Sequence, residues 1–391
     1  MKFENSVYSK IWDSNEGRQI VTSILNDPNL IKANHTFWRE KFLVDPMITP
    51  TNAEGEAVFT SRMRQLDSGV LMDMRAPLGD SKPEDVKGMK AYQGTIQEFI
   101  SKGTVEKATE RYYKEKFFAS LGDAELVGRY AMDVLQPKID SANQTLSYMS
   151  AYLLSNGNLA YMQGEGMQGN IYKAYIPAEN FKNAGAKVWA DTTAPLFDIW
   201  RDLVSEVNDE LGVEGVSWIL EIPRDMFDNV VLKNEQVIKW IKDAYLVQSS
   251  QIAAGTNNLS GLVVNEENFF KYIGQVQGLP TIVIVEEKQK DLHNGVVSGW
   301  KEGVAVLRPA GYAGLIRRTT IADVELFRDA FTNPANIYSF TPAMEGLAVV
   351  RNSTIVNGNL KEWHTDLVLA ATPSLDEFLY HYIIDTTKAN A

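Results

Sequence analysis

The segment Glu56–Arg75, EAVFTSRMRQLDSGVLMDMR, is the most informative stretch of this chain. Residues 56–64 have a strand-like pattern, and residues 65–69 supply a turn whose glycine tolerates a positive φ. Residues 70–75 then return as a second strand. The sequence thus predicts an extended hairpin with little apolar surface of its own. Because an isolated hairpin is marginally stable in water, neighbouring copies of the chain are expected to cover it.

The two faces of the predicted hairpin suggest which side chains a neighbour would meet. Val70, Met72 and Met74 fall on one face of the second strand, and Asp73 and Arg75 fall on the other. A neighbour's groove would cover the apolar face and provide partners for the charges. The predicted subunit-interface residues are Arg62, Arg64, Met72, Asp73, Met74 and Arg75.

The flanking segments have weaker patterns. Residues 1–46 mix short amphipathic stretches with polar turns, and the prolines at 46 and 50 favour extended chain. Residues 83–136 are expected to be helices separated by glycines. A clearer helix is predicted over 137–156, opened by Pro137 and ended by Gly157. Its apolar positions recur every three or four residues and are expected to lie on a sheet: Ile139, Ala142, Leu146, Met149 and Leu153.

Residues 188–345 have the pattern of one α/β unit. A broad apolar face predicts a helix over 196–211 that ends at Gly212. Strands are predicted at 216–220 and 304–307, and the continuous apolar run at 281–285 predicts a strand buried on both faces. Further strands that would close a sheet are expected at Leu347–Val350, Asp366–Ala371 and Leu379–Ile384.

Composition limits the chemistry that the chain can perform. The 391 residues include no cysteine, which excludes disulfides, thiolate nucleophiles and cysteine-ligated metals. No apolar run is long enough for a signal peptide or a membrane span, so a soluble intracellular product without membrane contact is expected. Residues 188–345 contain 13 basic and 22 acidic residues and so carry −9 of the formal net charge of −12. This acidity argues against a sequence-reading nucleic-acid protein.

Each candidate catalytic or binding motif lacks the context that its chemistry needs. The glycine pattern at 164–169 follows a predicted helix and precedes a strand, the reverse of a dinucleotide-binding turn. The acidic pairs Glu266–Glu267 and Glu286–Glu287 resemble solvated loop charges. Arg317–Arg318 would suit a phosphate, an acidic neighbouring subunit or a surface salt bridge. The histidines show no metal-ligand spacing: His35, His293, His364 and His381. We therefore expect no catalytic, cofactor-binding or metal-binding residue, no cofactor and no enzymatic activity.

The order of elements resembles that of the major capsid proteins of tailed bacteriophages with the Hong Kong 97 fold, nearest the lambda-like head proteins. The resemblance covers nearly the whole chain and is one of element order and length. The residues that carry it are the N-terminal arm, the hairpin Glu56–Arg75, the helix ending in Tyr148–Leu154, Ala194–Trp200, Val216–Leu220, Pro223–Met226, Val304–Gly311 and Gly346–Val350.

The resemblance implies an α+β fold with five parts. These parts are an N-terminal arm (1–46), an extended hairpin loop (47–80), a peripheral domain with a spine helix (81–187), an axial α/β domain (188–345) and a return to the peripheral domain (346–391). It also implies a shell protein of the virion that is present in the host cytoplasm during assembly. Its expected partners are itself, as pentamers and hexamers, portal, scaffolding and decoration proteins, and packaged DNA through weak, non-specific contact.

Two other functions fit parts of the sequence. A cargo-enclosing nanocompartment protein would share the fold, and a packaged enzyme in place of viral DNA would identify it. A soluble α/β enzyme with an unrecognised site would instead form a small oligomer with a defined cleft.

Overall fold

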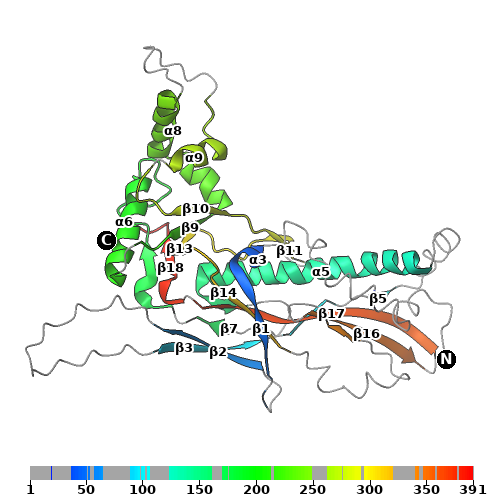
Figure 1. Cartoon of the computed structure of the whole chain (residues 1–391). Coiled ribbons are helices and arrows are strands. Elements are labelled where there is room, and N and C mark those ends of the chain that lie inside the picture. The colour runs from blue at the N-terminus through cyan, green and yellow to red at the C-terminus, as the bar shows by residue number, and fades with distance from the viewer. Residues whose placement is uncertain are drawn as a thin grey trace, which may run out of the picture.

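The structure of the protein is a computed structural model that confirms the mixed α and β class. Two main sheets and a set of helices account for most of the described residues (Figure 1). The described residues are 19, 37–50, 52, 57–64, 89–96, 98–101, 104–105, 123–160, 170–174, 176–212, 215–248, 262–274, 276–291, 295–319, 340–342, 347–356, 359–376 and 378–390.

The larger sheet has seven strands and is organised around one very long strand, β17 (Asn359–Leu375). β17 pairs with β14 near its C-terminal end, with β16 along its N-terminal part, and with β4 and β5. β1 runs parallel to β14 at one edge of the sheet, and β15 lies at the other edge. The other strands are β1 (Phe42–Thr49), β4 (Glu98–Ser101), β5 (Thr104–Val105), β14 (Gly314–Thr319), β15 (Phe340–Pro342) and β16 (Leu347–Val356).

A single long helix, α5 (Asp123–Asn156), lies along β17 and β16 (Figure 1). All five apolar positions predicted to face a sheet are buried, and Gly157 ends the helix at a φ of 69°. The predicted start at Pro137 is wrong, because the helix begins at Asp123 and continues through this proline. Proline's fixed φ is compatible with a helix, so an interior proline costs hydrogen bonding and some strain without always ending the helix.

The smaller sheet has five strands in the order β10-β9-β13-β18-β8. Its bounds are β8 (Phe181–Asn183), β9 (Trp218–Pro223), β10 (Thr281–Val285), β13 (Val304–Pro309) and β18 (Tyr382–Asp385). β10 is an edge strand with Thr281 exposed, so the expected burial of this strand on both faces is wrong. In the central strand β13, by contrast, the first five of six residues are buried.

Helices accompany the five-stranded sheet and rise from one end of α5 (Figure 1). The predicted helix over 196–211 is confirmed, with Gly212 in the left-handed conformation at its C-terminus. The helical elements here are η3 (Ala178–Asn180), α6 (Leu196–Leu211), α7 (Arg224–Met226), the π-turn η4 (Phe227–Val231), α8 (Glu235–Gln248), α9 (Glu266–Ile273) and η6 (Phe378–Tyr380).

The expected hairpin contains one strand that the structure describes and a different partner strand. β2 (Ala57–Arg64) agrees with the prediction, but it pairs with β3 (Met89–Ile96), with Arg64 opposite Met89. Residues 65–69 and 70–75 lie outside the described residues. The expectation of helices throughout 83–136 is wrong for β3, β4 and β5, because pairing with β2 and β17 decides the local structure there. Two further ribbons join β6 (Asn158–Ala160) to β7 (Asn170–Lys173) and β11 (Gln289–Asp291) to β12 (Gly295–Val297).

The chain crosses between the two main sheets several times. β14, within the expected axial segment 188–345, belongs to the seven-stranded sheet. β8 and β18, from the expected peripheral segments, belong to the five-stranded sheet. A short helix, α3 (Phe37–Lys41), precedes β1 and lies where the two sheets meet (Figure 1).

Candidate assembly site at the root of the hairpin

The predicted interface residues fall on the ribbon formed by β2 and β3 or on the residues that connect these strands. Arg62 and Arg64 lie on β2, although the structure does not describe their side chains. Met72, Asp73, Met74 and Arg75 lie outside the described residues. The described part of the ribbon is therefore its root, where it meets the body of the protein.

The ribbon root has one face on the body and one face in solvent. Phe59 and Ser61 of β2 are buried, as are Tyr92 and Ile96 of β3. Val58 and Thr60, which alternate with the buried residues of β2, are exposed, as the two-residue period of a strand requires. Among the described strands, β2 and β3 hydrogen-bond only to each other. Side chains, rather than a continuous sheet, must therefore fix the direction in which the ribbon leaves the body.

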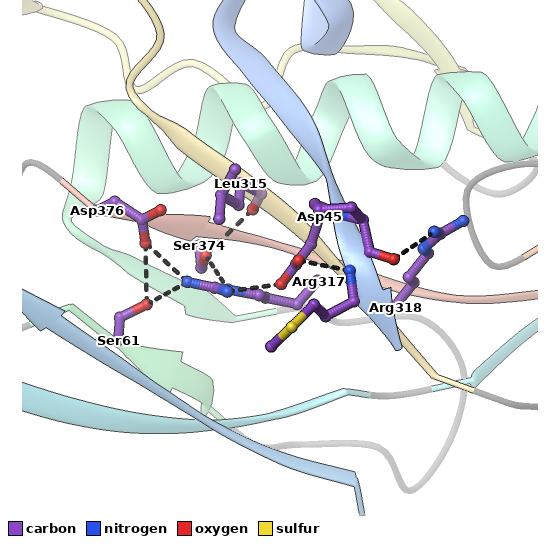
Figure 2. A network of polar contacts seen from close by, with 9 residues as sticks. Asp45, Ser61, Leu315, Arg317, Arg318, Ser374 and Asp376 are labelled. Atoms are coloured by element: carbon purple, nitrogen blue, oxygen red, sulfur yellow. Dashed lines mark hydrogen bonds and ion pairs between the residues drawn. The ribbon is translucent and has the colours of Figure 1, made fainter. Parts of the chain in front are cut away.

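Arg317 on β14 is the centre of the side-chain network that holds the root (Figure 2). Its guanidinium donates to Asp45 Oδ2 at 2.6 Å and to Asp376 Oδ1 at 3.0 Å. It also donates to Ser374 Oγ at 3.0 Å and to Ser61 Oγ at 3.1 Å. We call these five residues the Arg317 cluster. They come from β14, β1, β17, the residue following β17, and the ribbon.

Ser61 gives the ribbon its direct place in this network. Its hydroxyl accepts from Arg317 and donates to Asp376 Oδ1 at 3.0 Å. The Arg317 guanidinium also lies 5.7 Å from the centre of the Phe59 ring, which suits a cation–π contact. On the other strand, the Tyr92 hydroxyl donates to the carbonyl of Leu375. Both strands of the ribbon are thus attached to the residues around Arg317.

The partners of Arg317 are themselves held in place. Asp45 Oδ1 accepts from the amide of Met47 at 2.9 Å, which fixes the carboxylate in the irregular part of β1. The Ser374 hydroxyl donates to the carbonyl of Leu315 at 3.1 Å. These contacts hold the Asp45 and Ser374 side chains in the positions from which they accept hydrogen bonds from Arg317.

The Arg317 cluster contains one cation and two carboxyl groups. Burial raises the pKa of Asp376, and Asp45 adds to this effect, while Arg317 and Ser61 act against it. The side chains of Asp45 and Arg317 are 9% and 16% exposed, whereas that of Asp376 is 33% exposed. The cluster is therefore anionic when both carboxyl groups are ionised, and partial contact with water limits the cost of this excess charge.

Of the uses considered for the Arg317–Arg318 pair, the structure shows contacts within the chain. Arg317 forms ion pairs with Asp45 and Asp376. The neighbouring Arg318 donates to the carbonyl of Pro46 at 3.1 Å. Both arginines therefore fasten β1, and no free phosphate or neighbouring subunit is needed to explain them.

In the two acidic pairs, Glu266, Glu286 and Glu287 have partners within the chain. Glu266 and Glu286 both form ion pairs with Arg224, the former at 2.6 Å. Glu287 is buried and accepts from the Gly299 amide at 2.7 Å. Burial raises the pKa of Glu287, although its hydrogen bonds oppose the rise.

The remaining candidates do not converge on a site among the described residues. His381 is buried with Nε2 at 2.7 Å from the Leu154 carbonyl, and His364 lies in β17. His35, His293 and the glycine pattern at 164–169 lie outside the described residues. No group of histidine or acidic side chains in the described part of the chain could hold a metal ion. None of the described helices is long and apolar enough to cross a membrane.

Sequence reasoning missed most of the Arg317 cluster. Asp45, Ser61, Ser374 and Asp376 are ordinary polar residues in the sequence, and Ser61 is 256 positions from Arg317. No local pattern in the sequence marks these residues. Only the strand pairing brings them together.

The structure is similar to solved structures of phage proteins. One, a phage-related protein from Bordetella bronchiseptica RB50, is 12% identical, with a TM-score of 0.45 over 93% of this chain and 97% of that one. The mature capsid protein of bacteriophage PhiM1 is 11% identical, with a TM-score of 0.45 over 89% and 86%. The capsid protein of Ralstonia phage GP4 is 11% identical, with a TM-score of 0.41 over 90% and 91%. No family model and no curated protein matches the chain.

Proposed function

We propose that this chain is the major capsid protein of a tailed bacteriophage. Copies of the chain assemble as pentamers and hexamers into the icosahedral head shell that encloses the genome. The protein acts in the virion after assembly in the host cytoplasm. Portal, scaffolding and decoration proteins are its further partners, and its role is structural rather than catalytic.

The anchored ribbon is the observation that carries this proposal. Its root is fastened through Ser61 and Tyr92, while Val58 and Thr60 on the opposite face are exposed. A two-stranded ribbon is marginally stable alone, yet 24 residues separate Arg64 from Met89. A segment of this length, attached to the body at both ends, is long enough to reach a neighbouring subunit, and contacts of this kind would help to close a shell.

A ribbon-shortening variant tests the proposal. Arg64 and Met89 are opposite one another, so an Asn-Gly turn replacing residues 65–88 can close the ribbon. This variant removes Met72, Asp73, Met74 and Arg75. We expect it to give a circular dichroism spectrum like that of the wild type but to form no closed shells in negative-stain images or sedimentation.

The other possible results of these experiments distinguish the alternative functions. Normal shells from the shortened variant would contradict the role of the ribbon. A wild-type protein that remains a small oligomer under all assembly conditions would contradict the shell function and favour an enzyme. Shells that contain a packaged enzyme instead of DNA would favour a nanocompartment.

The acidity of residues 188–345 supports weak contact with packaged DNA. Phosphate contacts dominate affinity for DNA, and a region with a formal charge of −9 offers few of them. We expect the purified subunit to bind duplex DNA weakly at physiological salt in a filter-binding assay. Sub-micromolar binding that weakens steeply with added salt would contradict this expectation.

A further inference from the structure

The chain between β10 and β13 leaves the five-stranded sheet and packs on α5. The clasp, as we call this segment, consists of the described residues 286–291 and 295–303 and includes the strands β11 and β12. Its Lys301 amide donates to Ser155 Oγ on α5 at 2.9 Å. Its backbone at Gly299 lies so close to α5 that a Cβ there would overlap the carbonyl oxygen of Tyr148. Strand β11 also contacts α5 (Figure 1). The clasp therefore links the five-stranded sheet to the long helix.

Glu287 fixes the turn at which the clasp touches α5. Its Oε2 accepts from the Gly299 amide at 2.7 Å and from the Ser298 hydroxyl at 3.0 Å. Ser298 Oγ in turn accepts from the Trp300 amide at 3.1 Å. One carboxyl group thus orients three successive residues, and the middle one, Gly299, lies directly on the helix. The packing of the clasp on α5 therefore depends on the state of this carboxyl group.

Glu287 differs from the other buried glutamate, Glu221, in having no cationic partner. The two residues are 4% and 0% exposed. Glu221 forms ion pairs with Arg308 and Lys41, which lower its pKa to about 2. Glu287 forms no ion pair with a described residue, and burial raises its pKa against the effect of its hydrogen bonds. A buried charge is stable only when it is paired, so the two sites favour opposite protonation states.

The surroundings of Glu287 offer little charge to compensate its own. Helix α5 has no acidic or basic residue over 141–156, and Asp140 is roughly 12 Å along the helix axis from Tyr148. The titratable side chains of this stretch, Tyr148 and Tyr152, are uncharged as phenols. Gln289, the other buried polar side chain of the clasp, is an uncharged amide. The charged side chains that the structure describes in the clasp, apart from Glu287, are exposed: Glu286, Lys288, Lys290, Lys301 and Glu302.

The contacts of Glu287 suit the protonated acid. Both hydrogen bonds go to Oε2, whereas Oε1 has no hydrogen-bond partner. A proton on Oε1 leaves Oε2 as the carbonyl oxygen of the acid, which can keep both bonds. Loss of this proton keeps the same bonds but buries a negative charge that no cation balances. Neutral donors offset only part of the cost of burying that charge.

We propose that one proton on Glu287 sets how firmly the clasp packs on α5. With the proton bound, the turn at Gly299 is held without a buried charge. Without it, the charge favours open states in which water reaches the carboxylate. Because the folded protein holds this proton above the ordinary pKa of 4.5, the packing should be firmest below pH 4.5. It should weaken as the pH rises, until Glu287 is ionised in the folded protein as well.

Detection of the proton is the direct test. In the full-length chain labelled with carbon-13 at the glutamate side-chain carboxyl carbons, each carboxyl signal in the nuclear magnetic resonance spectrum shifts when its group ionises. The variant Glu287→Gln identifies the signal of Glu287, and Glu302→Gln identifies that of the exposed Glu302 as the matched control. We expect Glu287 to ionise at a higher pH than Glu302. A titration midpoint equal to or below that of Glu302 would overturn the proposal.

Hydrogen exchange at the Lys301 amide reports how firmly the clasp packs, because this amide donates to α5. Dividing the exchange rate of an unstructured peptide at the same pH by the measured rate gives a protection factor. Glutamine at position 287 keeps a carbonyl oxygen for Gly299 and does not ionise. At pH 4.5 the protection factors of Glu287→Gln and Glu302→Gln should agree within about twofold. Toward neutral pH, Glu287→Gln should become at least about threefold better protected than Glu302→Gln.

The other outcomes of the exchange measurement count against the proposal. A ratio of the two protection factors that stays constant with pH would show that ionisation of Glu287 does not affect the packing. A Glu287→Gln chain that does not fold would show that the carboxylate itself is needed, since a neutral side chain of the same shape should replace the acid. Both variants keep His381, so its titration cancels in the ratio. The proposal concerns the single chain, and both measurements decide it whether or not shells form.

Discussion

Lys41 and Arg308 both form ion pairs with the buried Glu221, and we call these three residues the Glu221 cluster. The Glu221 cluster and the Arg317 cluster both link distant parts of the chain, but the sign of their excess charge is opposite. Each joins a strand or helix from the N-terminal part of the chain to a sheet built mainly from later residues. The Glu221 cluster has a surplus cation in a fully buried site, whereas the Arg317 cluster has a surplus carboxyl group that is 33% exposed. Water can share the excess charge at the ribbon root but not at the five-stranded sheet.

This difference predicts how each cluster responds to the loss of a member. A buried charge without a partner cannot be rehydrated unless the structure opens. A partly exposed carboxylate can turn toward solvent at modest cost. We therefore expect larger losses of stability at the Glu221 cluster than at the Arg317 cluster.

Removing the only anion of the Glu221 cluster should be the most damaging change. Glu221→Gln leaves Lys41 and Arg308 as uncompensated cations, so we expect the free energy of unfolding to fall by about 3–5 kcal/mol. Urea denaturation followed by tryptophan fluorescence measures this quantity. Glu302→Gln, at an exposed glutamate, should change it by less than about 0.5 kcal/mol. Similar losses in both variants would remove the basis of the comparison.

Acid should destabilise the same region through His381. Its pKa is about 4 in the folded protein and ordinarily 6.5, so the unfolded chain binds the additional proton between these values. Stability should therefore fall as pH falls from about 6.5 toward about 4, by up to roughly 3 kcal/mol. The raised pKa values of Asp376 and Glu287 act in the opposite direction, and that of Glu221 matters only below 4.5.

Thermal unfolding as a function of pH, with and without His381→Gln, checks this assignment. Glutamine keeps a donor for the Leu154 carbonyl but has no proton to gain in this range. The slope between pH 6.5 and 4.5 should become shallower in the variant. An unchanged slope would assign the acid sensitivity to another group.

Loss of the cation at the ribbon root should have an intermediate effect. Arg317→Met leaves Asp45 and Asp376 without their guanidinium, and we expect a loss of about 1–3 kcal/mol because Asp376 can reach water. Arg318→Met is the matched control, because it removes a neighbouring arginine whose hydrogen bond is to the Pro46 carbonyl and not to a carboxylate of the cluster. Limited proteolysis should also cut the ribbon faster in Arg317→Met. A loss as large as that of Glu221→Gln would show that exposure does not distinguish the clusters.

The smallest effect is expected at the exposed ion pairs of Arg224. Glu286 is 62% exposed, and Arg224 keeps Glu266 as a partner when Glu286 is changed. Glu286→Gln should therefore cost less than about 1 kcal/mol, and added salt should reduce the difference further. A larger loss in the free energy of unfolding, measured by chemical denaturation, would show that these exposed ion pairs contribute as much as the buried clusters.

The sequence predicted the helices that bury one continuous apolar face, because this pattern is local. The apolar period of α6 and its end at Gly212 are local properties, and so is the buried stripe of α5. The mistaken helix start came from treating Pro137 as a boundary, although the packing of α5 on β17 stabilises a longer helix.

Strand partners could not be predicted in the same way. Residues 70–75 and 89–96 both have strand-like features, and only the packing of Tyr92 and Ile96 against the body favours the second as the partner of β2. The Arg317 cluster depends on these pairings, so no local pattern marks Ser61 or Asp376 as its members. That the hairpin region contacts neighbouring copies stays a prediction.

The central place of β17 also affects how the protein folds as it is synthesised. Strand β17, which spans residues 359–375, pairs directly with β4, β5, β14 and β16, and β1 joins the sheet through β14. Strands made early must therefore wait for most of the chain to leave the ribosome before their sheet can close. Such distant pairing slows folding and leaves strand edges open to aggregation in the interval. Helix α5 can form in that interval, because its backbone hydrogen bonds are local and need no later segment.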